Sequence, residues 1–170
     1  LTHDAIGAAV SRYLHERGKM RQAVLAGDDE RARLRAQSFV RTAMALGLPE
    51  PRVIHMPAPT THAQGREGLR QLQAMQQDID AVFCSSDLMA AGVLTEAVVQ
   101  GVSVPDDLAV VGFGDMDFAA SMSPSITSVH VDGVAIGEQA AEMIDARANG
   151  LWPAQQVVEI GFHIVAREST

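Results

Sequence analysis

One stretch, Asp80 to Phe118, restricts the possible folds of this 170-residue chain more than any other. It opens with the apolar run AVFCS, continues as a helical pattern, and closes after Gly101 and Pro105 with a second apolar run, LAVVGF. The pattern predicts a strand, a helix and a second strand. Two strands joined by a helix of this length lie parallel with a right-handed crossover, so their carboxyl ends are neighbours.

Polar residues follow both of these strands. Ser85, Ser86 and Asp87 come after the first strand, and Gly114 and Asp115 come after the second. In an open α/β sheet, ligands bind in the crevice beyond the carboxyl ends of the strands. The sequence therefore predicts a ligand-binding site at this edge, used for recognition rather than for catalysis.

The same alternation of strands and helices begins earlier in the chain. The elements expected before this stretch are a helix at 4–17, a strand at 20–27, a helix capped by Asp28 or Asp29, a strand at 52–56 and a helix at 65–77. The alternation up to Phe118 is the signature of a doubly wound parallel α/β sheet flanked by helices. The pattern then changes to an extended run, SITSVHVD, a helix at 133–149 and two short extended pieces around Gly161.

The composition limits the kinds of partner. A net charge of -8 and an isoelectric point near 5.1 argue against a surface for duplex DNA, because phosphate contacts need clustered Lys and Arg. The single cysteine, Cys84, lies in an apolar run, which indicates a packing role and a reducing compartment. No window approaches the roughly 18 consecutive apolar residues of a membrane span, and the first residues lack a signal-peptide pattern. These features predict a cytoplasmic chain without a membrane partner.

The sequence carries no recognisable catalytic or metal motif. His3, His55 and His62 do not have metal-ligand spacing, and one cysteine cannot build a thiolate zinc site. There is no G-x-S-x-G motif, and Ser85 and Ser86 have no base nearby in the sequence. We therefore expect no metal, no other cofactor and no enzymatic activity.

Four segments carry a family resemblance: YLHERGKMRQAVLAG, AVFCSSDLMAAGVLTEAVVQGVSVPDDLAVVGFGDMDFA, SPSITSVHVDGVAIGEQAAEMI and the closing VARES. In this order they resemble the effector-binding region of LacI/GalR-type transcriptional repressors, over nearly the whole chain. The resemblance implies a periplasmic-binding-protein-like fold of two lobes with a sugar-sized effector in the cleft. It also implies that a helix-turn-helix and the first half of the N-terminal lobe lie upstream of this chain.

The resemblance also divides the chain between the two lobes. Residues 20–123 are expected to form the C-terminal lobe, to which residues 155–170 return. Residues 1–17 and 124–150 are expected to belong to the N-terminal lobe. The chain would then contain one near-complete lobe and part of a second.

Five residues are candidates for contact with the effector: Arg35, Ser86, Asp87, Asp115 and His3. Arg35 lies near a helix start, where a cation opposes the helix dipole, so a ligand contact explains it better than helix stability does. The resemblance places a cleft arginine here, and a solvated arginine is the alternative. Asp87 fits the helix N-cap rule and also the site, while Asp115 either reaches the ligand or pins its turn. Ser86 and His3 occupy positions where many relatives carry a side-chain amide.

The helix from Leu88 to Val99 is apolar on nearly every side, which predicts that its outer face is also covered. The resemblance implies that this helix and the segment after the next strand pack against a second copy in a two-fold dimer. The implied contact residues are Leu88, Met89, Ala91, Met116 and Met122. A helix buried within a single chain is the alternative.

Together these observations predict the effector-sensing and dimerisation region of a LacI-type DNA-binding transcriptional regulator. It would bind a small carbohydrate or sugar acid, and it would reach operator DNA only through the upstream domain. The segment GFGDMDFAA resembles the gluconate-responsive branch of the family, which favours an open-chain sugar acid. A periplasmic sugar-binding protein of a transport system is the alternative, and a hydrolase would need a nucleophile and a base within hydrogen-bond reach.

Overall fold

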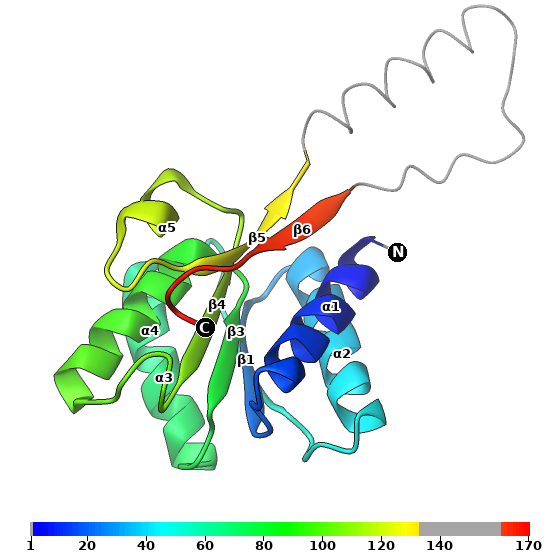
Figure 1. Ribbon diagram of the computed structural model, residues 1–170, viewed down its shortest axis with the longest axis horizontal. Coiled ribbons are helices and arrows are strands. Elements are labelled where there is room, and N and C mark those ends of the chain that lie inside the picture. Colours follow the sequence, from blue (N-terminus) through cyan, green and yellow to red (C-terminus); the bar gives the residue numbers. More distant parts are fainter. Residues whose placement is uncertain (1, 133–160) are drawn as a thin grey trace, which may run out of the picture.

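The computed structural model describes residues 2–132 and 161–170 (Figure 1). Its elements are, in chain order, α1 (Thr2–Glu16), β1 (Gln22–Gly27), α2 (Glu30–Ala45), β2 (Arg52–Met56), α3 (His62–Met75), β3 (Ala81–Cys84), α4 (Asp87–Gln100), β4 (Ala109–Phe113), α5 (Asp117–Ser121), β5 (Thr127–Val131) and β6 (Phe162–Val165). The strands and helices predicted up to Phe113 are present, with small differences at their ends. The short helix α5 was not predicted, and the helix expected at 133–149 lies outside the described residues.

The six strands form one sheet in the order β2-β1-β3-β4-β5-β6. Neighbouring strands from β2 to β5 pair parallel, and β6 pairs antiparallel with β5. This confirms the mostly parallel α/β sheet that the sequence predicts. The strand order reverses direction between β1 and β3, and in doubly wound sheets the ligand crevice opens at such a switch point, beyond the carboxyl ends of the strands.

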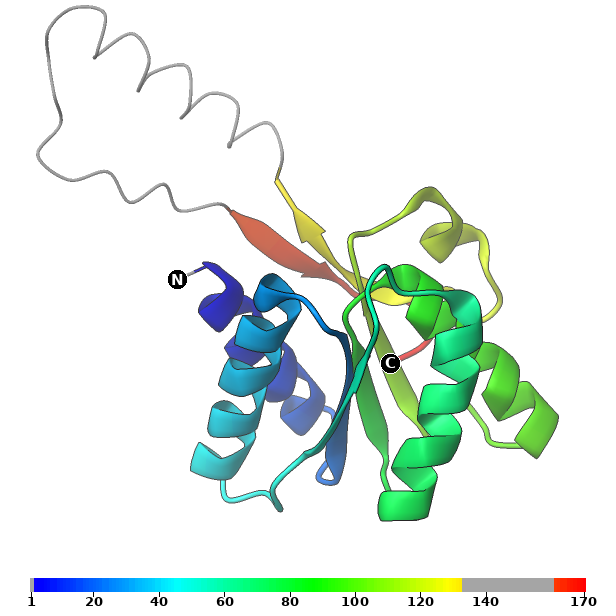
Figure 2. The ribbon, with the colours of Figure 1, turned by 180° about the vertical axis from the view of Figure 1, so that it is seen from behind.

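Helices cover both faces of the sheet (Figures 1 and 2). Helices α1 and α2 lie on one face, and α3 and α4 lie on the other. Successive strand side chains alternate between faces, so β1 sends Ala23 and Leu25 into the α3–α4 core and Val24 and Ala26 into the α1–α2 core. A strand buried on both faces requires the continuous apolar run that the sequence shows.

The position of α1 corrects the assignment of residues 1–17 to a separate lobe. Its stripe of Ile6, Val10 and Leu14 is fully buried in the core shared by α2 and the sheet. The two helices approach closely because position 7 is glycine: a Cβ on Gly7 would lie 2.1 Å from the carbonyl oxygen of Arg35. Helix α1 therefore belongs to the same body as strands β1 to β4.

The strand β5 requires a second correction. It lies in the segment 124–150, which was assigned to the second lobe, yet it pairs with β4 from Val111–Thr127 to Phe113–Val129 and so extends the same sheet. At the other end of the described chain, Ser169 Oγ donates to the carbonyl of Val110 at 2.6 Å. Backbone pairing holds β5 to β4, and a buried hydrogen bond holds Ser169 to β4. A sequence pattern does not reveal such contacts between distant residues.

Capping side chains explain two of the helix starts. Asp29 is the N-cap of α2, and its carboxylate accepts the N–H of Ala32 at 2.9 Å. Thr61 and Gln64 form a reciprocal capping box at the start of α3, which is why this helix begins a few residues before the predicted start at residue 65.

Candidate functional site

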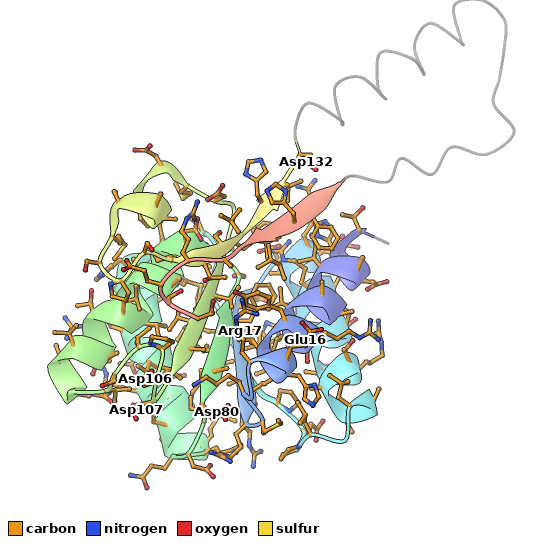
Figure 3. The ribbon with its side chains drawn as sticks, in the orientation of Figure 1. Glu16, Arg17, Asp80, Asp106, Asp107 and Asp132 are labelled. Carbon is orange, nitrogen blue, oxygen red and sulfur yellow. The ribbon has the colours of Figure 1, made fainter. Side chains whose placement is uncertain are left out.

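The two ends of the parallel sheet differ in what their polar side chains do. Asp80 and Asp107 lie at the amino end (Figure 3), where Asp80 accepts the N–H groups of Met20 and Arg21, and Asp107 accepts the N–H of Ser103. These carboxylates close turns. The carboxyl end is where the fold places a ligand crevice, and the candidate side chains gather there.

Arg35 is the most buried cation described in the structure, with 5% of its surface exposed. Its Nη1 lies 3.2 Å from Nδ1 of His3, and its Cζ lies 3.8 Å from the ring centroid of Phe113. Its Nε is buried and has no hydrogen-bond partner among the described residues. The fold thus brings together the predicted residues Arg35 and His3 from α2 and α1, and adds Phe113 from the end of β4.

The electrostatics of this group favour an acceptor that the described chain does not supply. Burial lowers the pKa of Arg35 to about 10, against a partly compensating effect of Asp29. Burial and the neighbouring Arg35 also lower the pKa of His3. Since a guanidinium only donates, His3 Nδ1 accepts this hydrogen bond, so the ring is the neutral tautomer protonated on Nε2. A desolvated guanidinium with a spare N–H suits a carboxylate or a row of hydroxyls.

Ser86 lies in a group of hydroxyls at the same edge. Its Oγ accepts the hydroxyl of Thr60 at 2.7 Å and the N–H of Met89 at 3.2 Å, which makes Ser86 the N-cap of α4. With its acceptor positions filled, the Ser86 hydroxyl hydrogen remains to be donated. Beside it, Ser85 Oγ accepts the N–H of Gly27 at 2.8 Å. Thr60 belongs to the proline-rich loop, so this loop forms one wall of the edge.

Asp87 is fully buried. The N-cap of α4 is Ser86, so the prediction that Asp87 caps this helix is wrong. Its Oδ2 accepts the N–H of Met116 at 2.7 Å, and its Oδ1 accepts the hydroxyl of Ser128 at 2.7 Å. Burial raises the pKa of the Asp87 carboxyl, and these two hydrogen bonds only partly offset that effect. The carboxylate fits because a Cβ on Gly112 would lie 2.1 Å from Oδ1.

Asp115 pins its turn, which was one of the two alternatives that the sequence left open. It has a left-handed backbone conformation with φ of 52°. Its Oδ1 accepts Nη2 of Arg167 at 2.6 Å, its Oδ2 lies 2.9 Å from Nδ1 of His130, and its N–H donates to Ser128 Oγ at 2.9 Å. Both carboxylate oxygens are therefore used within the protein. No sequence pattern indicates these two partners: His130 reaches Asp115 from β5, and Arg167 reaches it from the segment after β6.

Replacing Arg167 with Met is expected to lower the free energy of unfolding by about 2 kcal/mol at pH 7, because it leaves a largely buried carboxylate without its cation. Burial acts to raise the pKa of Asp115, but the bonds from Arg167 and His130 prevail and lower it. This stabilisation is present above the unfolded-state value of about 3.9 and is lost as the pH falls through the folded-state value. Urea unfolding at pH 7 and pH 3 measures the difference.

The control for that prediction is Arg21→Met, which removes an exposed ion pair with Asp78 and should change stability by less than about 1 kcal/mol. An equal loss for Arg167→Met at both pH values would mean that the arginine acts through packing alone.

Cys84 is buried, and burial raises the pKa of its thiol, so it is an unreactive packing residue. Within residues 2–132 and 161–170, no group of three His, Cys, Asp or Glu side chains is arranged to hold a metal. The helices of that same part of the chain include none long and apolar enough for a membrane crossing.

The predicted dimer residues divide into exposed and buried ones. Leu88 and Met116 are 39% and 46% exposed, whereas Met89 and Ala91 are buried within the chain at 0% and 5%. These two are therefore wrong as surface contacts, because they face α3 and the sheet. Met122 is partly buried against the α3–α4 core. The exposed residues Val98 and Val99 at the end of α4 were not among the named contacts.

Comparison with known proteins gives the family. The sequence model of the periplasmic binding protein-like domain family matches residues 11–170 of this chain. The HTH-type transcriptional regulator GntR of Pseudomonas aeruginosa is 36% identical over 166 residues, which cover 96% of this chain and 48% of that protein. The chain thus spans about half the length of the curated relatives it matches.

Solved structures agree with this family. The crystal structure of the transcription regulator GntR from Chromobacterium violaceum has a TM-score of 0.87 and 31% identity, over 99% of this chain and 63% of that one. A complex of the transcriptional regulator CelR with cellobiose has a TM-score of 0.84 and 27% identity, over 100% of this chain and 53% of that one. With its mostly parallel sheet and helices on both faces, the chain belongs to the periplasmic binding protein-like domain family, in the form found in LacI-family transcriptional regulators.

Proposed function

We propose that the chain is the effector-sensing region of a LacI-type DNA-binding regulator and that it binds a small carbohydrate or sugar acid. The ligand would lie at the carboxyl ends of β1, β3 and β4. The observation that carries this proposal is Arg35, a buried guanidinium with an unpaired Nε at this edge. The structurally similar regulator CelR was solved as a complex with cellobiose, which supports a sugar-sized ligand.

The side chains at this edge match the chemistry of a polyhydroxylated ligand. Arg35 can donate two parallel hydrogen bonds to a carboxylate or to adjacent hydroxyls, and the Ser86 hydroxyl supplies a further donor. Phe113 covers one face of the guanidinium and keeps water away from it. Arg35 and Ser86 offer donors here, whereas the carboxylates of Asp87 and Asp115 accept hydrogen bonds from within the protein. This balance favours a ligand rich in acceptors, such as a sugar acid.

The mechanism would be a shift between conformations. A ligand that binds one arrangement of the two lobes more tightly increases the population of that arrangement by its difference in affinity. In the full-length regulator, this shift would change the spacing of the DNA-binding domains.

A thermal-shift screen of the full-length protein against sugars, sugar acids and sugar phosphates tests the proposal. A ligand at 100 times its dissociation constant should add about 2.7 kcal/mol of stability. D-Gluconate represents the open-chain acids, and cellobiose represents the neutral sugars. A selective shift by members of one class supports the proposal, whereas no shift with any carbohydrate contradicts it.

The outer side of α4 and the segment after β4 would form the contact with a second copy of the chain. Leu88 and Val99 are separated by about three helical turns and so lie on one side of α4. They are 39% and 65% exposed, and Met116 adds a further exposed apolar side chain. Most of the remaining residues of α4 are buried, with Met89, Ala90, Val93 and Leu94 in the core, while Val98 and Gln100 at its C-terminal end are exposed. An outer face this apolar is explained by a covering partner.

Replacing Leu88 with Lys is expected to weaken dimerisation at least about tenfold, because a charge would be buried in an apolar contact. Sedimentation velocity over a concentration series measures the dissociation constant. Met44→Lys is the matched control, since Met44 is 52% exposed on α2, on the opposite face of the sheet. Equal weakening by both substitutions would place the contact elsewhere.

A further inference from the structure

One buried side chain, Asp87, holds the turn at the end of β4. Its Oδ2 accepts the N–H of Met116, and its Oδ1 accepts the hydroxyl of Ser128. The same Ser128 Oγ accepts the N–H of Asp115 at 2.9 Å. Two successive backbone N–H groups of the turn are therefore fixed, directly or through Ser128, by one carboxylate. The partners are 29 and 41 residues away in the chain, so the contact joins α4, β5 and this turn.

The turn lies between the two surfaces proposed above. On its β4 side, Phe113 lies against the guanidinium of Arg35 at the effector edge. On its other side, Met116 is exposed at the proposed dimer contact, together with Leu88, which follows Asp87 on α4. A displacement of the turn moves Phe113 and Met116 together, because only two residues separate them.

We propose that Asp87 is a positioning residue that couples effector binding to the dimer contact by holding the turn at residues 114–116. This inference rests on the proposed function, since it requires an effector at the carboxyl edge of the sheet. Asp87 itself touches neither the effector nor the partner; it acts through the turn. Ser128 connects Asp87 to Asp115, because its hydroxyl donates to Asp87 and accepts the N–H of Asp115.

The charge state of Asp87 gives the coupling a distinctive pH dependence. An ionised carboxylate only accepts hydrogen bonds, so it can serve both donors, whereas the protonated acid brings a third hydrogen into the same space. Burial raises the pKa of Asp87 and the nearby Asp115 adds to this effect, while Met116, Ser128 and Arg167 oppose it. Asp115, the other carboxylate of the turn, has a lowered pKa. On acidification Asp87 is therefore protonated first.

The test compares Asp87→Asn and Ser128→Ala with the wild type and with Asp106→Asn, an exposed control that removes a charge of the same sign from the loop before β4, at the opposite end of the sheet. The dimer dissociation constant of the full-length protein is measured by sedimentation with and without saturating D-gluconate, and with cellobiose as the second probe, from pH 5 to pH 8. In the wild type and the control, the bound sugar should change the constant at least about fivefold. In the other two variants, the change should be below about twofold.

Two outcomes would separate the inference from the function on which it rests. If the wild type binds neither probe nor any carbohydrate of the screen, the proposed function fails. If the wild type shows the sugar-dependent change and both variants retain it, Asp87 has no coupling role. The pH profile is a further readout: the sugar-dependent change should fall on acidification in the wild type and fall less in Asp87→Asn, in which the contact of His130 with Asp115 at the same turn remains. Should Asp87→Asn not fold, Ser128→Ala decides, because it keeps the carboxylate.

Discussion

Replacing Arg35 with Met is expected to stabilise the unliganded protein and to weaken effector binding strongly. The guanidinium is 5% exposed, its Nε has no partner among the described residues, and burial lowers its pKa to about 10. A cation whose pKa is lowered by folding destabilises the native state at every pH where it is charged, which includes neutral pH. An apolar side chain of similar length removes that penalty, and we expect a gain of about 1–3 kcal/mol in the free energy of unfolding.

The same substitution should lower the affinity for the sugar or sugar acid found in the screen by about 100-fold, since it removes a desolvated pair of hydrogen bonds. Urea unfolding and calorimetric titration measure the two effects on one sample. Arg41→Met is the matched control, because the Arg41 side chain is 65% exposed on the same helix and both quantities should be nearly unchanged. A loss of stability in Arg35→Met would indicate that the arginine serves the fold.

Replacing Gly92 with Ala is expected to lower the free energy of unfolding by about 2–4 kcal/mol. A Cβ at this position would lie 2.0 Å from the carbonyl oxygen of His62 and 2.9 Å from Cα of Gly65. Both are backbone atoms, so α3 and α4 would have to separate. Helix propensity alone predicts the opposite sign, because alanine is favoured over glycine in a helix by about 1 kcal/mol. The sign of the change therefore decides between close packing and propensity.

Thermal or urea denaturation gives that sign, and Val98→Ala is a suitable control on the same helix. Val98 is 77% exposed, so its truncation should change stability by at most about 0.5 kcal/mol. The Gly92 substitution should also disturb the ligand edge, because α3 follows the loop that brings the hydroxyl of Thr60 to Ser86. A Gly92→Ala protein as stable as the wild type would contradict the close contact described between α3 and α4.

Much of the candidate site could be located from the sequence because it follows strand ends. Ser86 and Asp115 come directly after apolar runs, and parallel strands bring their carboxyl ends to one edge. Arg35 was identified from its unfavourable place near a helix start and from the family resemblance. What these side chains do was harder to predict: Asp87 and Asp115 have polar partners that the sequence pattern did not indicate. Arg167, for example, is 52 residues away from Asp115.

Local sequence patterns are enough to predict the alternation of strands and helices, the parallel sheet and the edge at which a ligand would bind. Those properties depend on periodicity and on strand ends, which are local. The three-dimensional structure was needed to show that α1 packs on α2, that Met89 faces inward while Leu88 faces outward, and that Asp87 is buried against Ser128. An amphipathic pattern specifies that a face is buried but not which neighbour covers it. A buried carboxylate becomes recognisable only when its distant hydrogen-bond donors are brought beside it.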